Sequence, residues 1–232
     1  MRASVPPGAG GGPWEGASSG AARPGLDVRL RHLCSLAVLV VLGRRDELPA
    51  YLRAAVAAGV PPDLLRELLL QTLFYCGWPR ALEGFETLDG VMREGKGIAP
   101  EPIPSALPGP AVGGAEYFDR VYGKDAEKVR ARLVAHHPLL AEITADTVYD
   151  RVLSRPALSP RMRECLAVAM LAALGSQRAF LGHLRGAIAW GARPAVLREI
   201  LSQVTLHLPD LDLSWAFDLV AHAAGEARAP GT

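Results

Sequence analysis

Three polar side chains follow one another at every fourth position of a segment that is otherwise apolar. Glu67, Gln71 and Tyr75 therefore form one stripe along a single expected helix. The segment is leucine-rich on more than one face, which predicts that this helix is buried. A buried carboxylate and a buried amide need hydrogen-bond partners. The stripe predicts either a network that orients helices or the lining of a site.

A second pair of residues could transfer protons. Glu164 and His183 are predicted to lie on consecutive helices joined by a tight turn at Gly175. A carboxylate can orient an imidazole and stabilise its protonated form, which suits the imidazole to acid/base chemistry near neutral pH. A single histidine in a helical protein can equally be structural, and the spacing alone does not separate the two interpretations.

Both sets of residues belong to an internal repeat. When the chain is shifted by 132 positions, residues 31–71 align without a gap on residues 163–203, with 16 identical pairs. The second copy of the polar stripe is Glu199, Gln203 and His207. The residue that corresponds to Glu164 is His32, and the one that corresponds to His183 is Tyr51. We interpret the repeat as a duplication.

The elements that position these residues are predicted to be helices throughout. In the first copy, helices are expected over 27–42, 46–58 and from 61 to the Gly77-Trp78-Pro79 corner, with another over 80–94. In the second copy, Ser159-Pro160 opens a helix that ends at Gly175, the next ends at Gly191, and Pro194 opens the third, with a further helix over 213–228. Residues 115–155 show apolar residues at helical spacing. The fold class is therefore all-α.

Glycine and proline mark the boundaries between domains. The chain of 232 residues holds 24 glycines and 19 prolines, and many of them lie in residues 1–25 and 97–114. We expect a disordered tail over 1–25, a first repeat over 26–96, a linker over 97–114, and a second repeat with an N-terminal helical extension over 115–228.

Charge and cysteine content exclude several classes of protein. A formal net charge of +1 gives no overall attraction to nucleic acid or to anionic membranes, so neither is expected as a partner. The longest apolar run, 33–42, is too short to span a membrane. Cys34, Cys76 and Cys165 have neither disulfide-framework nor zinc-site spacing, so we expect a reduced, cytoplasmic protein without a metal.

These motifs together resemble the carboxymuconolactone decarboxylase family. The resemblance rests on the run from Tyr149 to Glu164, then Gly175, His183, Gly191, Glu199 and Gln203, and in the first half on Gly43, Gly59, Glu67, Gln71 and Tyr75-Cys-Gly-Trp-Pro79. It covers about residues 27–95 and 115–225. It implies an all-helical, alkylhydroperoxidase-like fold that assembles into trimers or hexamers, here a trimer of pseudo-dimers, with sites at subunit contacts.

The resemblance also implies an activity. The founding reaction of the family is loss of CO2 from a carboxylated muconolactone, without metal or organic cofactor. The peroxidase branch of the family uses a Glu, a CxxC pair and a His as a proton relay. Glu164 and His183 match that Glu and that His, but Ser176 and Ala179 stand where the cysteines would be. Thiol-dependent peroxide reduction is not expected.

Each copy has lost part of the pattern. The first has His32 and Tyr51 in place of the Glu and the His, and the second has His207-Leu-Pro-Asp in place of the Tyr-x-Gly-x-Pro corner. We expect the copies to complement each other in one composite site. His183 is expected to be the general acid/base and Glu164 its orienting partner. The expected substrate-binding residues are Tyr75, Gln71, Glu67, Tyr51, His32, Trp78 and Gln203.

The sequence leaves three functions open. The first is a cofactor-free lyase that decarboxylates a small carboxylated lactone or keto-acid-like substrate. The second is an enzyme of secondary metabolism with the same fold, such as a cyclase, isomerase or hydrolase. The third is a non-catalytic helical scaffold. A pocket that unites Glu164 and His183 favours an enzyme, whereas burial of both in packed apolar surroundings favours the scaffold.

Overall fold

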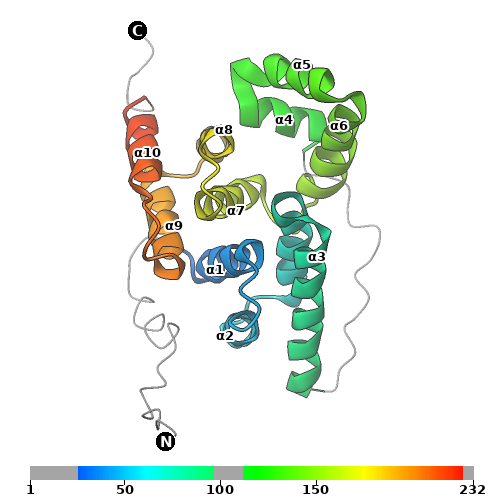
Figure 1. Cartoon of the computed structure of the whole chain (residues 1–232), viewed down its shortest axis with the longest axis vertical. Coiled ribbons are helices and arrows are strands. Elements are labelled where there is room, and N and C mark those ends of the chain that lie inside the picture. The colour runs from blue at the N-terminus through cyan, green and yellow to red at the C-terminus, as the bar shows by residue number, and fades with distance from the viewer. Residues whose placement is uncertain (1–25, 97–111, 227–232) are drawn as a thin grey trace, which may run out of the picture.

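The computed structural model describes residues 26–96 and 112–226, and within them every regular element is a helix, which confirms the all-α prediction (Figure 1). The first repeat forms α1 (Val28–Leu42), α2 (Leu48–Ala57) and α3 (Pro62–Lys96). The extension forms α4 (Gly114–Tyr122), η2 (Gly123–Asp125), α5 (Ala126–His136), α6 (Pro138–Glu142) and the π-helix η3 (Ile143–Leu153). The second repeat forms α7 (Pro160–Ala173), α8 (Gln177–Ala189), α9 (Pro194–His207) and α10 (Ser214–Glu226).

The two repeats begin and end their helices in the same way. The carboxylate of Asp27 caps α1 and the hydroxyl of Ser159 caps α7, each accepting from a backbone N–H of the first turn. Gly43 and Gly175 end the first helix of each repeat with φ of 68° and 66°, a left-handed conformation that favours glycine. These matched caps position equivalent helices in both copies.

The repeats form one body around a shared core. The central helices α1 and α7 pack against each other, and α3 and α9 lie on opposite sides of them (Figure 1). Each repeat's first helix also contacts the third helix of the other repeat, α1 with α9 and α7 with α3. Buried side chains of both copies, such as Leu36, Leu39, Leu166 and Met170, belong to one hydrophobic cluster. This arrangement confirms the predicted pseudo-dimer.

The corner at Gly77 differs from the expected helix end. The sequence predicts a stop at Gly77-Trp78-Pro79 and a new helix from Arg80, but the helical path continues as α3 with a sharp kink. Gly77 has φ 77° and ψ 171°, and Pro79 follows within two residues. In the second repeat the two equivalent helices are separate: α9 ends at His207, and α10 begins at Ser214 after a short loop.

The extension packs as a small layer beside the second repeat. Its core is aromatic and contains Tyr117, Phe118 and Tyr149. Helix α4 begins at Gly114, inside the range expected to be linker, and a Cβ on this residue would lie 2.6 Å from the Cα of Asp150. This close approach of α4 to η3 requires glycine. The rest of the expected linker, 97–111, and the expected tail, 1–25, lie outside the described residues.

None of the helices in the described ranges has the length and apolarity needed to cross a membrane.

Candidate functional site

Glu164 and His183 are in direct contact. Nδ1 of His183 lies 2.8 Å from Oε2 of Glu164. The turn at Gly175 folds α8 back onto α7, which brings the two side chains together as the spacing predicts. The side chain of Glu164 is 1% exposed and that of His183 is 13% exposed. Burying a carboxylate is costly unless it is paired, so this hydrogen bond also stabilises the fold.

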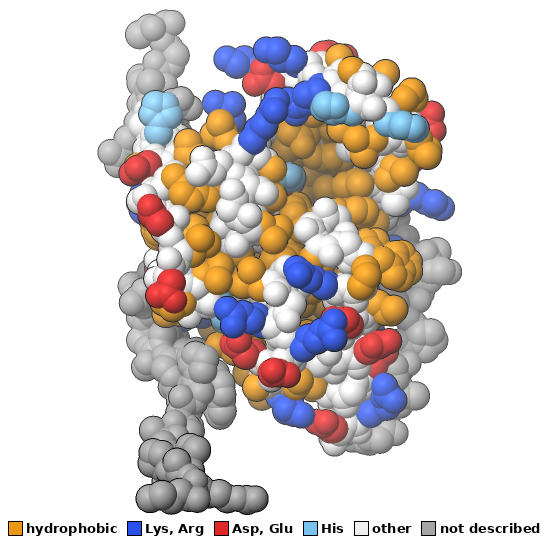
Figure 2. Space-filling view, in the orientation of Figure 1, with side chains coloured by type: hydrophobic (Ala, Val, Ile, Leu, Met, Phe, Trp, Pro, Cys, Tyr) orange, Lys and Arg blue, Asp and Glu red, His pale blue; other side chains and the backbone are white. Residues whose placement is uncertain are grey.

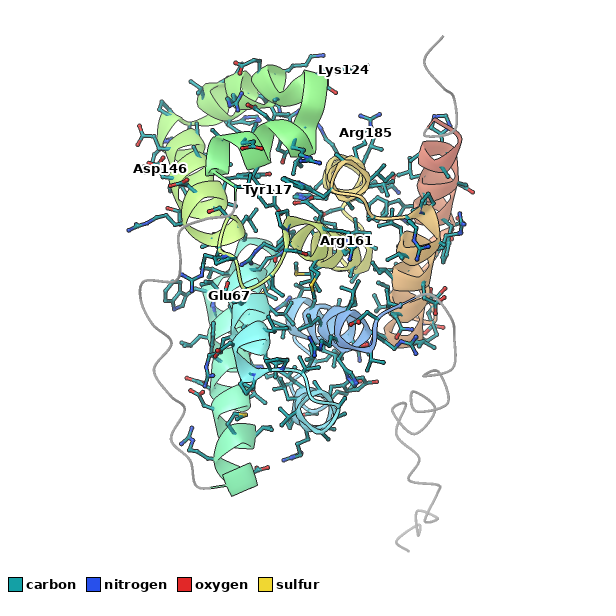
Figure 3. The ribbon with its side chains drawn as sticks, turned by 180° about the vertical axis from the view of Figure 1, so that it is seen from behind. Glu67, Tyr117, Lys124, Asp146, Arg161 and Arg185 are labelled. Carbon is teal, nitrogen blue, oxygen red and sulfur yellow. The ribbon has the colours of Figure 1, made fainter. Side chains whose placement is uncertain are left out.

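The other oxygen of Glu164 is held by a tyrosine of the extension. The hydroxyl of Tyr117, on α4, donates to Oε1 of Glu164 over 3.0 Å. Figure 3 shows Tyr117 reaching from the extension toward the second repeat. An ionised carboxylate that accepts at both oxygens places a proton on Nδ1 of His183. The Nε2 atom of that imidazole is then available for proton exchange with another molecule.

Three more tyrosines surround this pair, and each is kept neutral. The ring of Tyr75, on α3, lies 6.2 Å from the ring of His183, in an edge-on orientation. Burial raises the pKa of Tyr75 well above its usual value, and the charge of Glu164 adds to the shift. Burial is also the largest cause of the raised pKa values of Tyr122 and Tyr149, to which the charge of Glu164 contributes. These phenols are therefore hydrogen-bond donors rather than phenolates at neutral pH.

The rest of the polar stripe forms a buried network between the repeats. Glu67 accepts from Arg163 at one oxygen and from Arg155 at the other, each over 2.8 Å. The amide of Gln71 donates to the backbone oxygen of Arg163 over 2.8 Å, and its nearness to the Tyr75 phenol lowers the pKa of that phenol, against the larger effect of burial. The stripe thus joins α3 to α7 through Glu67 and Gln71 and presents Tyr75 to His183. The sequence did not single out Arg155 as a partner of Glu67.

The equivalent position in the pseudo-dimer lacks the carboxylate–histidine pair. Tyr51 and His207 meet there, with ring centroids 5.3 Å apart. Burial lowers the pKa of His207 to about 4, with a smaller contribution from Arg44, so this imidazole is neutral at pH 7. Burial also lowers the pKa of His32, which replaces Glu164. Of the residues expected to bind substrate, Tyr51, His32 and Gln203 belong to this second position by the repeat offset.

Trp78 lies away from both positions. Trp78 is 68% exposed and directly follows the kink of α3 at Gly77. It lines a small apolar depression of about 80 Å³ together with Leu70, Leu73, Ala81, Leu82 and Phe85. The structure therefore places Trp78 on a surface patch, and none of the residues of the Glu164–His183 pair lines that depression.

A cavity of about 300 Å³ lies where the extension meets α8, and neither Glu164 nor His183 lines it. Its wall includes Gly182, the neighbour of His183, and Tyr122. Figure 2 shows a hollowed apolar surface on this side of the molecule, with lysine and arginine side chains crowded along one edge. A larger cavity of about 470 Å³ lies within the extension itself, between α4, α5, α6 and η3. The described residues hold no group of three His, Cys, Asp or Glu side chains that could bind a metal ion.

Sequence reasoning could not find Tyr117 and Tyr122. Both lie in the extension, which has no counterpart in the first repeat. Their contacts with the second repeat depend on how the extension folds back over α7 and α8. The only local signal was their position on the apolar face of an expected helix, and such a face is more often core than site.

Two comparisons identify relatives of the chain. The family model described as carboxymuconolactone decarboxylase family matches residues 13–89 and 138–208. A 4-carboxymuconolactone decarboxylase from Acinetobacter baylyi is 42% identical over 81 residues, which is 35% of this chain and 60% of that protein. Peroxisomal protein 2 from Schizosaccharomyces pombe is 26% identical over 172 residues, covering 69% of this chain and 77% of that protein. The match with the Acinetobacter protein thus spans less than two thirds of that relative. Because the family model matches each repeat, the chain belongs to the carboxymuconolactone decarboxylase family.

Proposed function

We propose that the chain is a cofactor-free lyase that removes CO2 from a small carboxylated lactone or keto-acid-like substrate. The observation that carries this proposal is the Glu164–His183 pair, which is held at both carboxylate oxygens and has neutral Tyr75 beside the imidazole. The similarity of 81 residues to a 4-carboxymuconolactone decarboxylase supports the same class of substrate.

The reaction needs an electron sink and an acid. The bond between the substrate carbon and its carboxylate breaks, CO2 leaves, and the electron pair passes into the conjugated carbonyl of the substrate. A proton then adds to the resulting enolate at carbon. His183, protonated at both nitrogens, gives that proton from Nε2 while Glu164 holds Nδ1–H. One proton from solvent restores His183, so the net reaction consumes one proton for each CO2 released.

Tyr75 is the proposed donor to the enolate oxygen. Its phenol is neutral and lies at the edge of the His183 ring, so it can stabilise negative charge that develops on a carbonyl beside the imidazole. Gln71, one turn before Tyr75 on α3, is proposed to help position that phenol. Glu67 is not proposed to contact the substrate, because arginines already bind both of its carboxylate oxygens.

A panel of substrates tests this function. CO2 release and loss of substrate are measured together for carboxylated lactones, for β-keto acids and for their methyl esters. The proposal predicts equal rates of CO2 release and substrate loss for at least one free acid, and no turnover of its ester. Turnover without CO2 would favour an isomerase, cyclase or hydrolase in the same site, and no turnover across the panel would favour the scaffold.

Gly186→Ala should lower turnover although alanine favours helices. A Cβ at Gly186, on α8, would lie 2.7 Å from Oε2 of Glu164 and 3.1 Å from a methyl of Val121. The methyl would displace the carboxylate from His183, and a misplacement of this kind costs on the order of 10²-fold in rate. The first repeat has Ala54 at the equivalent position, where the opposing residue is not a glutamate.

Gly90→Ala is the matched control, measured in the same assay for kcat. Gly90 lies within α3, and a Cβ added to it would meet nothing within 4 Å, so this change should leave turnover intact and add about 0.5–1 kcal/mol of stability. Equal kcat for both variants would show that the position of the Glu164 carboxylate does not govern the rate.

We further propose that three chains associate into a trimer of pseudo-dimers. Trp78 and Leu82 are 68% and 45% exposed beside the depression on α3, and exposed apolar area of this kind is typical of contact surfaces. Light scattering of the purified chain should give about three times the monomer mass of 24.6 kDa. Trp78→Glu should shift the mass toward the monomer. A strict monomer for the unmodified chain would exclude this assembly.

The proposed location is the cytoplasm. All three cysteines are free, and burial raises the pKa of the thiols of Cys34 and Cys165, which disfavours oxidation. Free thiols suit a reducing compartment.

A further inference from the structure

The cavity between the extension and α8 has a strongly cationic lining. Two cations, Lys128 and Arg132, lie one turn apart on α5, and two more, Arg178 and Arg185, lie two turns apart on α8. We call this cavity, lined by these four residues together with Val121, Tyr122, Asp125, Val129, Leu181 and Gly182, the arginine cleft.

The positive charge of the arginine cleft is largely uncompensated. Its one lining carboxylate is Asp125, which lies 4.0 Å from Arg185. Within the described residues, Lys128, Arg132 and Arg178 pair with no carboxylate. Among the described residues, Arg45, Arg53 and Arg130 each have an acidic partner elsewhere on the surface, but Arg161 and Arg198 have none, so the cleft is distinguished by its four cations around one cavity. All four cations are exposed to solvent, and a cleft lined mainly by one sign of charge attracts counter-ions, so this lining indicates an anion-binding site.

The arginine cleft adjoins the turn of α8 that carries His183. Gly182 lines the cleft and precedes His183 in the chain. A Cβ at Gly182 would lie 3.4 Å from the ring of Tyr122, so glycine here lets α8 approach α4 closely. Tyr122 lies within electrostatic reach of both Glu164 and Arg132. The cleft and the Glu164–His183 pair thus use adjacent residues of the same helix, α8, and both lie near Tyr122.

We propose that the arginine cleft binds the non-reacting, polyanionic arm of the substrate, an arm that carries at least two carboxylate or phosphate charges. This inference deepens the proposed function and rests on it for the position of the reacting end. Arginine side chains match the oxyanions of carboxylates and phosphates with paired hydrogen bonds, and a cavity of about 300 Å³ has the size of a small-molecule site.

Calorimetric titration of the full chain tests the inference with two unreactive probes. Propane-1,2,3-tricarboxylate represents polycarboxylates, and inorganic pyrophosphate represents phosphates. We expect one probe to bind with a 1:1 ratio and the other to bind more weakly, which identifies the chemistry of the arm. Because charge–charge contacts are screened, the affinity should fall as NaCl is raised from low to physiological concentration.

The Arg132→Gln/Arg178→Gln double variant should weaken this binding at least about tenfold, because it removes two charge-assisted contacts. The charge-preserving Arg132→Lys/Arg178→Lys variant should retain part of it. Arg198→Gln, which removes an exposed charge on α9, is the matched control and should bind as the unmodified chain does. Circular dichroism verifies that each variant is folded.

Three results would overturn the inference: neither probe binds, the double Gln variant binds as tightly as the unmodified chain, or a single-stranded oligonucleotide displaces the probe at lower concentration than either small anion. His183→Gln separates this inference from the proposed function. If that variant binds the probe normally, the anion site stands whether or not the chain decarboxylates anything. If turnover is found but no probe binds, the function stands without the anion site.

Discussion

Replacing His183 with glutamine should reduce the rate of CO2 release by about 10²–10⁴-fold, the contribution of a positioned acid or base. Glutamine has a similar reach and can still hydrogen-bond Glu164, but it cannot carry and deliver a proton. The imidazole is only 13% exposed and contacts the edge of Tyr75, so a substitution of similar length should preserve the packing. The measurement is kcat for the best substrate of the panel, with far-UV circular dichroism to confirm the fold.

His136→Gln is the control for this prediction. His136 is exposed near the end of α5 and is outside the site, so its replacement should leave kcat unchanged. If His183→Gln retained the kcat of the unmodified chain with an unchanged helical spectrum, His183 would not be the acid and the assignment of roles would fail.

Glu67→Ala should destabilise the fold by about 3–5 kcal/mol, because it leaves a buried arginine without its counter-charge. The side chain of Arg163 is 0% exposed and bonds Glu67 over 2.8 Å, and Arg155 bonds the other oxygen. These contacts join the first repeat to the second through α3 and α7. Urea unfolding at pH 7 measures the loss as a decrease in the midpoint of the transition.

Glu94→Ala is the matched control on the same helix. Glu94 pairs with Arg53 over 2.8 Å, but both side chains are more than half exposed, so we expect a loss of less than about 1 kcal/mol. Glu67→Leu/Arg163→Met removes both buried charges and should recover much of the stability lost in Glu67→Ala. Equal losses for the two alanine variants would show that the buried network does not hold the repeats together.

The fold could be predicted from the sequence because both copies carry the same residues at the ends of their helices. Glycines at the same offsets end equivalent helices, and the aligned positions place the polar stripe of one copy opposite the first helix of the other. The contact between Glu164 and His183 follows from the same local signals, since one turn connects their helices. Local rules suffice where the partners are close along the chain.

The rest of the candidate site depends on contacts that no local rule supplies. Tyr117 reaches Glu164, and Arg155 reaches Glu67, across large separations in the chain. The sequence could not show which residues of the polar stripe are structural and which face the site. Glu67 and Tyr75 share one helical periodicity, but Glu67 binds Arg163 whereas Tyr75 contacts His183. The cations of the arginine cleft come from two elements that meet only after the extension has folded onto α8.

We propose that His183, oriented by Glu164, protonates the product of decarboxylation, and isotope labelling follows that proton directly. CO2 release from carboxylated lactones is measured in D2O for the unmodified chain and for His183→Gln, with the product analysed by mass spectrometry. We expect one CO2 and one carbon-bound deuterium for each substrate consumed by the unmodified chain, and loss of both with His183→Gln. CO2 release at equal rates by the two proteins, or by neither, would contradict the proposal.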